Sequence, residues 1–275
     1  CADETDGESL RPCTQVLETL LAYELDSGET IPSLATACEG NEDATVWTCY
    51  LREGVTFHEG QTLEPSDVEY SFERGLLQGS YSSPQWLLAE PFFGVGLDDI
   101  TCLVDDCASH DDREALSAND PATLLAACET VTSAIESDND AGTVTMTLAA
   151  PWGPFIPTIA SSWGSVLDED WVKEQGMWDG DCNTWQNYYA EPSESNTLTP
   201  IMNGTGPFIL DHYTNGEELV LVRNDNYWRE PAHLERIVWK YVDEWGTRFA
   251  MAQAGDADFF SVPPANRSQV DALSG

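Results

Sequence analysis

Apolar and polar residues alternate in the first part of residues 51–76, LREGVTFHEGQTLEPSDVEYSFERGL. Val55 and Phe57 alternate with Thr56 and His58, and this period of two predicts the end of a half-buried strand. No second histidine or acid stands at motif spacing from His58. We therefore interpret His58 as a structural or surface residue rather than as a functional one.

The period changes to that of a helix in the second part of the same stretch. Val68, Phe72 and Leu76 recur at helical spacing on one face. Pro65 suits the first helical position, because its missing N–H is not needed there. Asp67 lies in the first turn, where the helix dipole favours a carboxylate. These features predict a helix whose apolar face packs against a core.

Four segments near the C-terminal end predict strands and a helix. Residues 203–228 hold two strand-like runs joined by Asn215-Gly216, which is a strong hairpin signal. Residues 236–242 predict a further strand, residues 246–255 a short helix stopped by its final glycine, and residues 257–262 a last strand. Because strands alternate with helices, the predicted fold class is α/β.

Residues 98–140 look like an acidic insertion, with twelve Asp and Glu residues against one base, Arg113. Residues 128–136 and 143–151 are strand-like and flank the sequence DNDAG at 138–142. That sequence hints at a calcium loop, but neither its ligand spacing nor its closing glutamate matches such a loop. A hairpin turn is therefore the favoured interpretation, and calcium binding is the alternative.

Composition narrows the function classes. The chain has 275 residues, 41% of them hydrophobic, which is enough for one large domain or two moderate ones. There are 49 Asp and Glu residues against 11 Lys and Arg, a net charge of -38. Such a charge repels nucleic acid and anionic membranes, so binding to nucleic acid is excluded, and it favours solubility.

The eight cysteines predict disulfides in an oxidising compartment, because none forms a CxxC pair and no Cys/His group has zinc-finger spacing. One pair follows from register. Closing CEGNEDATVWTC as a hairpin around Asp43 and Ala44 puts Cys38 opposite Cys49, within disulfide reach. The pairing of the other six stays open, and Cys1 is also a candidate for a lipidated N-terminus.

No enzyme motif is present. The patterns GxSxG, HExxH, GxGxxG and the phosphate-binding P-loop are all missing, and pairs of acids carry no information among so many. We therefore expect a protein that is not an enzyme and has no cofactor. No run of 18 apolar residues exists, so no membrane span is expected.

Several ordered segments resemble one family. LREGVTFHEGQTLEPSDVEYSFERG and the preceding VLETLLAYELDSGETIPSLA are similar to the family 5 extracellular solute-binding proteins, the peptide- and nickel-type receptors of ABC importers. NGTGPFIL, LVRNDNYW, RIVWKYV and FAMAQAGDADF resemble later family segments in the same order. The resemblance implies a periplasmic-binding-protein-like fold of type II, with mixed sheets and an inserted subdomain. It also implies a non-enzymatic, extracytoplasmic protein that delivers a solute to a membrane permease.

The chain also departs from the family pattern. Family members begin with a strand before the segment matching VLETLL, and they continue past DFFSVPP into a second lobe. The resemblance therefore implies a first-lobe core at 1–32 and 154–275, an inserted subdomain at 33–153, and a ligand cleft that lacks half its wall. A binding-protein lobe reused as a structural or interaction module on the cell surface is the alternative function.

The resemblance nominates residues for the ligand cleft. SSPQW at 82–86 matches a family segment whose aromatic residue can contact the ligand. SSWG at 161–164 offers small polar groups and a Trp at the end of an apolar run, and NGTG at 203–206 offers backbone N–H groups in a flexible loop. The nominated residues are Tyr81, Trp86, Ser161, Ser162, Trp163, Asn203, Gly204 and Thr205. Core packing or turn geometry is the competing explanation for each of them. Peptides are the favoured ligands, with sugars, opines and metal complexes as alternatives.

Overall fold

The computed structural model describes residues 7–192, 195–198 and 200–272. Its helices are α1 (Gly7–Val16), α2 (Pro65–Gln78), α3 (Trp86–Phe93), α4 (Thr101–Asp105), α5 (Arg113–Ser117), α6 (Pro121–Thr132), α7 (Phe155–Ile159), α8 (Glu169–Glu174), α9 (Trp245–Ala254) and α10 (Arg267–Asp271), with short 3-10 turns η1 (Ser162–Gly164), η2 (Trp185–Asn187) and η3 (Pro264–Asn266). Its strands are β1 (Leu21–Tyr23), β2 (Thr30–Pro32), β3 (Ala35–Gly40), β4 (Val46–Leu51), β5 (Ile135–Asp138), β6 (Thr143–Thr147), β7 (Phe208–Thr214), β8 (Glu218–Arg223) and β9 (Arg236–Lys240).

The described strands form three sheets, with orders β1-β2, β3-β4-β6-β5 and β7-β8-β9. Helices and strands alternate along the chain, so the predicted α/β class is confirmed. Every strand pair within these sheets is antiparallel, whereas mixed sheets were expected. The reason is that most neighbouring strands are joined by short hairpins, which permit only antiparallel pairing.

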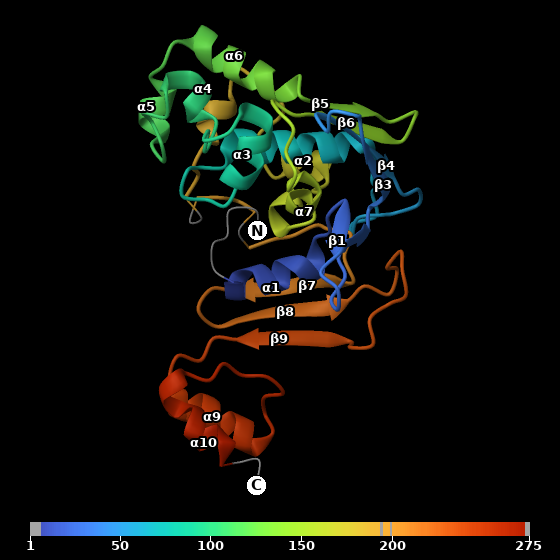
Figure 1. Cartoon of the computed structure of the whole chain (residues 1–275). Coiled ribbons are helices and arrows are strands. Elements are labelled where there is room, and N and C mark those ends of the chain that lie inside the picture. Colours follow the sequence, from blue (N-terminus) through green and yellow to red (C-terminus); the bar gives the residue numbers. More distant parts are fainter. Residues whose placement is uncertain (1–6, 193–194, 199, 273–275) are drawn as a thin grey trace.

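The predicted helix at residue 65 is α2, and it lies between the four-stranded sheet and the helices above it (Figure 1). Pro65 occupies its first turn as expected. Asp67 accepts hydrogen bonds from the backbone N–H of Glu64 at 2.8 Å and of Glu169 at 2.9 Å. The expected strand end at residues 55–58 was wrong, because only an isolated bridge between Thr56 and Thr62 forms there.

The hairpin of β3 and β4 has the predicted register. Cys38 lies opposite Cys49, and the two form a disulfide with a Cα–Cα distance of 4.0 Å. Asn41 Oδ1 accepts hydrogen bonds from the backbone of Thr45 and Val46, which closes the turn. Among the other cysteines, Cys102 pairs with Cys107 and Cys128 with Cys182. Cys1 lies outside the described residues.

The acidic segment is mostly helical and forms α4, α5, α6 and β5. The prediction of a strand over residues 128–136 was partly wrong, because residues 128–132 end α6 and only Ile135–Asp138 pairs in the sheet. The N-cap Asp120, whose side chain accepts from Ala122 N, starts that helix, and its buried face includes Leu124, Ala127, Cys128 and Val131. The hairpin turn at DNDAG is confirmed, since it joins β5 to β6.

The C-terminal predictions are confirmed except for one strand. Asn215-Gly216 joins β7 to β8, β9 completes their sheet, and Gly255 ends α9 in the left-handed region. Residues 257–262 form no strand. Phe260 instead packs near Trp245, with ring centroids 6.3 Å apart, so this segment folds back on α9 rather than pairing with a sheet.

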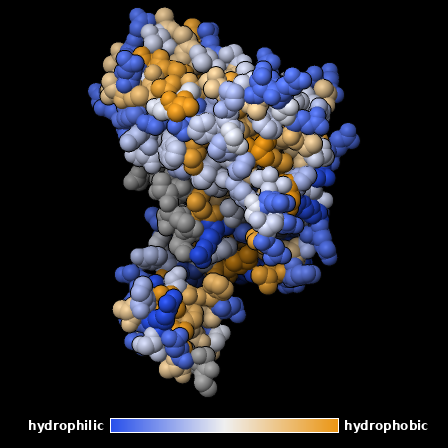
Figure 2. Space-filling model, in the orientation of Figure 1, coloured by the Kyte–Doolittle hydropathy of each residue, from blue (hydrophilic) through white to orange (hydrophobic). Residues whose placement is uncertain are grey.

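Two cores hold these elements together. The larger joins α2, α3, α6 and α7 to the four-stranded sheet and includes Trp178, Trp185 and Phe72. The smaller consists of Val16, Leu17, Phe208 and Leu221, where α1 packs on β7 and β8 (Figure 1). Outside them, polar residues cover much of the face shown in Figure 2, with apolar residues between them.

Candidate ligand-binding surface

One concavity lies where α1 ends and β1 begins, next to the segment that leads into β7. It encloses about 260 Å³. Its lining residues are Thr14, Glu18, Thr19, Ala22, Tyr23, Ser33, Ala160, Ser162, Ser165, Pro207, Tyr227 and Arg229. Apolar surface and a few convergent polar groups are the usual make-up of a small-molecule site. Of the residues nominated from the sequence, only Ser162 lines it.

Glu18 organises one wall of this concavity. Its carboxylate accepts hydrogen bonds from Thr205 Oγ1 at 2.8 Å, Tyr227 OH at 2.7 Å and Trp228 Nε1 at 2.7 Å. Burial and the neighbouring Glu18 charge raise the pKa of Tyr227, so this tyrosine keeps its proton and remains a donor. One carboxylate therefore ties the end of α1 to the segment after β8.

Arg229 is the one basic side chain among the lining residues. Its Nη2 donates to Ser33 Oγ at 3.1 Å, and its guanidinium lies 4.2 Å from the centre of the Trp228 ring. Cation–π contact and the serine hydrogen bond hold the charge in place. A guanidinium fixed in this way is suited to bind a carboxylate.

Tyr23 marks the opposite rim. It is 43% exposed, and its hydroxyl donates to Pro157 O at 2.6 Å and lies 3.4 Å from Ser161 Oγ. Ser161 therefore adjoins the concavity without lining it. Trp163 packs against the larger core, and its buried indole N–H has no hydrogen-bond partner among the described residues.

Tyr81 and Trp86 lie away from the concavity. Tyr81 precedes α3, and Trp86 is the first residue of α3. They are 50% and 40% exposed, and neither lines the concavity. The Tyr81 ring stacks on the His110 imidazole, with centroids 4.5 Å apart and an interplanar angle of 6°. Exposure leaves both aromatic side chains able to contact a ligand, so their role stays a prediction.

The segment Asn203-Gly204-Thr205 was expected to be a flexible loop that offers free backbone groups, and the structure corrects this. Asn203 is 1% exposed and Thr205 0%. Asn203 Nδ2 donates to Asp168 Oδ2 at 3.0 Å, and Glu59 N donates to Asn203 Oδ1 at 3.2 Å. A Cβ at Gly204 would lie 2.0 Å from Val16 O, so only glycine permits this close packing.

His58 makes structural contacts, and its lack of a role in binding stays a prediction. Its Nε2 lies 2.9 Å from Gly206 O, and its backbone N–H donates to Gly204 O at 2.8 Å. Burial lowers the pKa of His58, so the neutral ring persists at neutral pH. The residue joins the loop before α2 to the segment before β7.

The sequence interpretation missed Glu18, Tyr23 and Arg229. Glu18 was detectable as an acid inside the apolar run QVLETLLAYEL, where an unpaired charge would be costly. Arg229 follows the quoted segment LVRNDNYW directly. Nothing in the local sequence shows that these residues meet, because they lie on segments about 200 positions apart.

Comparisons with known proteins decide the family. Residues 29–274 match the model of bacterial extracellular solute-binding proteins, family 5 Middle. The chain belongs to this family. A dipeptide-binding protein of Escherichia coli is 24% identical over 251 residues, which cover 89% of this chain and 38% of that protein. Heme-binding protein A of Haemophilus influenzae is 24% identical over 255 residues, which cover 90% of this chain and 38% of that protein.

Solved structures show the same fold. DppA of Helicobacter pylori in complex with the peptide STSA superposes with a TM-score of 0.66 at 23% identity, covering 98% of this chain and 46% of that one. HbpA2 of Haemophilus parasuis gives a TM-score of 0.64 at 24% identity and covers 98% and 46%. The chain therefore spans less than half the length of these relatives. Its family is one of extracellular binding proteins, and no described helix is long and apolar enough to cross a membrane.

Proposed function

We propose that this chain is the solute-capturing part of an ABC importer outside the cytoplasm, and that it takes short peptides or similar small carboxylates. The observation that carries the ligand class is Arg229, a cation held at the rim of the concavity in a protein of net charge -38. Relatives named for dipeptides, heme and nickel show that ligand class varies within the family. The relative solved with a peptide supports the peptide class.

In this proposal the ligand carboxylate binds the Arg229 guanidinium, and Tyr23 and Ser162 contact its backbone. The exposed Tyr81 and Trp86 contact side chains of longer ligands. The division into a first-lobe core at 1–32 and 154–275 with a subdomain at 33–153 belongs to the same proposal, as do a permease partner and a lipid anchor at Cys1. Since the chain spans about 38% of the dipeptide-binding relative, contacts from further segments would complete the site.

Binding by the 275 residues alone is expected to be weak. Two-lobed receptors complete most ligand contacts on closure. Losing even ~4 kcal/mol of contact energy weakens affinity about a thousandfold. Saturation-transfer NMR, which detects weak binding, is the suitable measurement with di- to pentapeptides in excess.

The experiment compares each peptide acid with its C-terminal amide. We expect transfer from the wild-type chain to the acids, a reduced signal for the amides, and loss of signal in Arg229→Met. Arg236→Met is the matched control, because Arg236 is exposed on β9 and does not line the concavity. Equal transfer to acids and amides, or an unchanged signal in Arg229→Met, would remove the proposed ligand class.

A further inference from the structure

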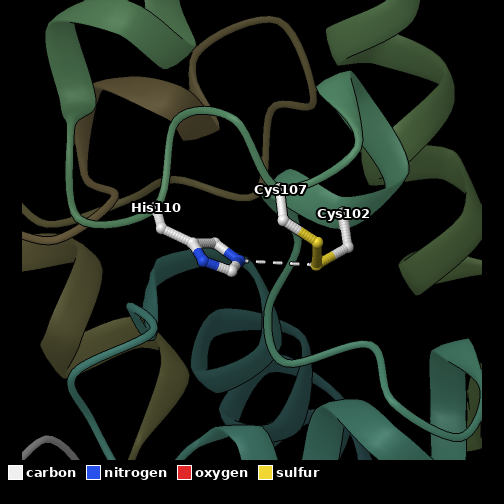
Figure 3. Close-up of side chains that lie close together, drawn as sticks. All are labelled: Cys102, Cys107 and His110. Carbon is white, nitrogen blue, oxygen red and sulfur yellow. Dashed lines mark hydrogen bonds between the residues drawn. A yellow bond between two sulfur atoms is a disulfide. The ribbon is translucent and has the colours of Figure 1, made fainter.

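A cluster of sulfur and imidazole lies in the acidic segment, apart from the concavity. Cys102 Sγ is 3.5 Å from His110 Nε2, and Figure 3 shows the imidazole pointing at the Cys102–Cys107 disulfide. Across residues 7–192, 195–198 and 200–272, these three are the one group of His, Cys, Asp or Glu side chains close enough to share a metal ion, all ligand atoms lying within 4.8 Å of one another.

The distance between sulfur and nitrogen fits a tetrahedral metal site. Zn–S bonds of about 2.3 Å and Zn–N bonds of about 2.0–2.1 Å at a tetrahedral angle place the two ligand atoms about 3.5 Å apart. Cys102 Sγ and His110 Nε2 already have this separation. The two sulfur atoms would need to move apart to about 3.8 Å, which requires the disulfide to open.

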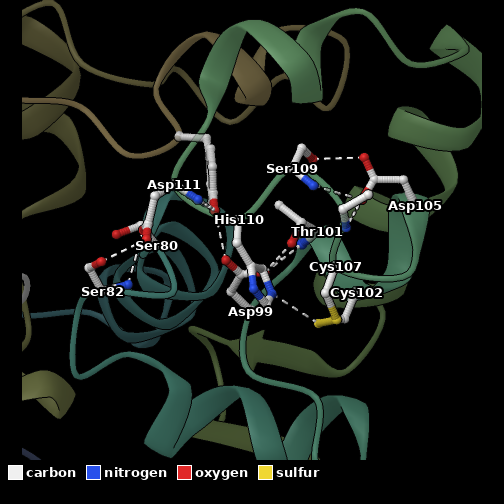
Figure 4. A network of polar contacts seen from close by, with 12 residues as sticks. Ser80, Ser82, Asp99, Thr101, Cys102, Asp105, Cys107, Ser109, His110 and Asp111 are labelled. Carbon is white, nitrogen blue, oxygen red and sulfur yellow. Dashed lines mark hydrogen bonds and ion pairs between the residues drawn. A yellow bond between two sulfur atoms is a disulfide. The ribbon is translucent and has the colours of Figure 1, made fainter.

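Tyr81 holds the His110 ring by stacking, and Asp99 adds negative charge beside the nitrogen that would bind the metal. Asp99 Oδ1 lies 3.4 Å from His110 Nε2, and the Asp99 side chain is 1% exposed. Tyr189 OH donates to Asp99 Oδ2 at 2.7 Å, and Tyr81 covers the other side of the imidazole. Figure 4 shows Asp99 and His110 next to the disulfide, together with the nearby Ser82, which donates to Asp111. A buried carboxylate beside the cluster favours a bound cation.

The Cys102–Cys107 disulfide closes the shortest loop of the three described disulfides, with a sequence separation of 5 against 11 and 54. In the chain-entropy model a short loop gains the least stability from its cross-link. We therefore expect this disulfide to be the one whose opening costs the fold least.

We propose that Cys102, Cys107 and His110 form a reduction-dependent site for a zinc-class metal ion. A dithiol reductant gives two electrons to the disulfide, the S–S bond breaks, each sulfur takes a proton, and the reductant becomes a disulfide. The metal ion then replaces the two thiol protons, which pass to solvent, and binds two thiolates and His110 Nε2. Water takes the fourth position, since the His110 side chain is 22% exposed.

The test uses the whole chain, reduced with a phosphine, freed of reductant without oxygen, and titrated with Co²⁺ followed by Zn²⁺. We expect one Co²⁺ per chain, with a sulfur-to-cobalt charge-transfer band and the visible bands of tetrahedral cobalt, both removed by Zn²⁺. The oxidised chain should show neither band. His110→Ala should weaken Co²⁺ binding by about a hundredfold, and Cys102→Ser/Cys107→Ser should abolish the band.

Cys38→Ser/Cys49→Ser is the matched control and should keep the band, because this pair has no histidine beside it in the described structure. A reduced, folded wild-type chain without the band, or a band that survives Cys102→Ser/Cys107→Ser, would overturn the site.

Graded reduction with alkylation and peptide mapping tests the same proposal if full reduction unfolds the chain. Cys102 and Cys107 should be alkylated first while circular dichroism still shows the fold. Earlier opening of Cys38–Cys49 or Cys128–Cys182, or loss of the fold at the same reductant concentration, would contradict it.

Discussion

Two helices of this chain differ in how far they are buried. α2 buries twelve of its residues, whereas α9 buries none. Both carry apolar residues, and both begin and end with ordinary helix signals. The difference is that α2 is surrounded by α6, α8 and the four-stranded sheet, while α9 lies beyond β9 and packs mainly on its own neighbours (Figure 1). An apolar face stabilises a helix only where another element covers it.

The same contrast extends to the surrounding regions. The disulfide-linked region, residues 33–190, contains Cys38–Cys49, Cys102–Cys107 and Cys128–Cys182 and most of the larger core. The C-terminal region, residues 234–272, has no cysteine, and it exposes Leu234, Tyr241 and Phe259 by 62%, 68% and 89%. We therefore expect the first region to determine the global stability of the chain and the second to open locally at low cost.

Matched tryptophan substitutions should show the largest difference between the regions. Trp178 is 0% exposed, stacks on Tyr70 and donates to Asp181 O. Trp178→Ala should lower the free energy of unfolding by about 3–5 kcal/mol. Trp245→Ala, at a half-buried position in α9, should lower it by less than about 1 kcal/mol. Urea unfolding followed by far-UV circular dichroism measures both. Equal losses would mean that α9 unfolds with the larger core.

Removal of single disulfides tests how much each cross-link stabilises the disulfide-linked region. Cys128–Cys182 closes a loop with a sequence separation of 54, and Cys38–Cys49 one of 11. Chain-entropy estimates give losses of about 4 kcal/mol for Cys128→Ser/Cys182→Ser and about 3 kcal/mol for Cys38→Ser/Cys49→Ser. Thermal unfolding of both double variants gives the ranking. A larger loss for the short hairpin would show that local strain matters more than loop length.

The pH dependence of the free energy of unfolding should show the next largest difference between the two regions. Burial raises the pKa of Asp67 to about 7. The folded state then holds a proton that the unfolded state releases near pH 4, so the stability present below pH 4 is lost as the pH rises towards 7. Between pH 5 and pH 7 the wild type should lose about 2 kcal/mol more than Asp67→Asn.

Glu244→Gln is the control in the C-terminal region. Hydrogen bonds to Thr247 and Gly246 lower the pKa of Glu244, so its contribution is present above its unfolded pKa and lost only as the pH falls through its folded value. In Glu244→Gln, the free energy of unfolding should change between pH 5 and pH 7 as it does in the wild type. A wild-type slope in Asp67→Asn would contradict the assignment to Asp67.

His58→Ala should have the smallest effect. It removes the contact between His58 Nε2 and Gly206 O, which joins the first region to the segment before β7, and should cost about 1 kcal/mol. Ligand binding should stay unchanged, because His58 does not line the concavity. His212→Ala is the control, since the His212 side chain is 41% exposed and its ring nitrogens lie beside the nearby acids Asp211 and Glu218. A large loss of peptide binding with the fold intact would assign His58 a functional role.

Local features were predictable from the sequence because they depend on neighbours in the chain. Helix periodicity and Pro65 place α2, Asn215-Gly216 places the β7–β8 turn, and the spacing within CEGNEDATVWTC pairs Cys38 with Cys49. The family resemblance rested on ordered segments of the same kind, and the family match confirms it.

The packing of distant segments was decided only in three dimensions. The run 128–132 became part of α6, which contacts α2 and buries Cys128 and Val131. Residues 257–262 formed no strand, and Phe260 packs near Trp245 of α9 instead. Asn203 and Thr205 are buried because Asp168 and Glu18, far away in the sequence, accept their hydrogen bonds. Hydrophobic period and turn chemistry act over a few residues, whereas burial and the grouping of Glu18, Tyr23 and Arg229 around one concavity depend on contacts that the chain makes only when folded.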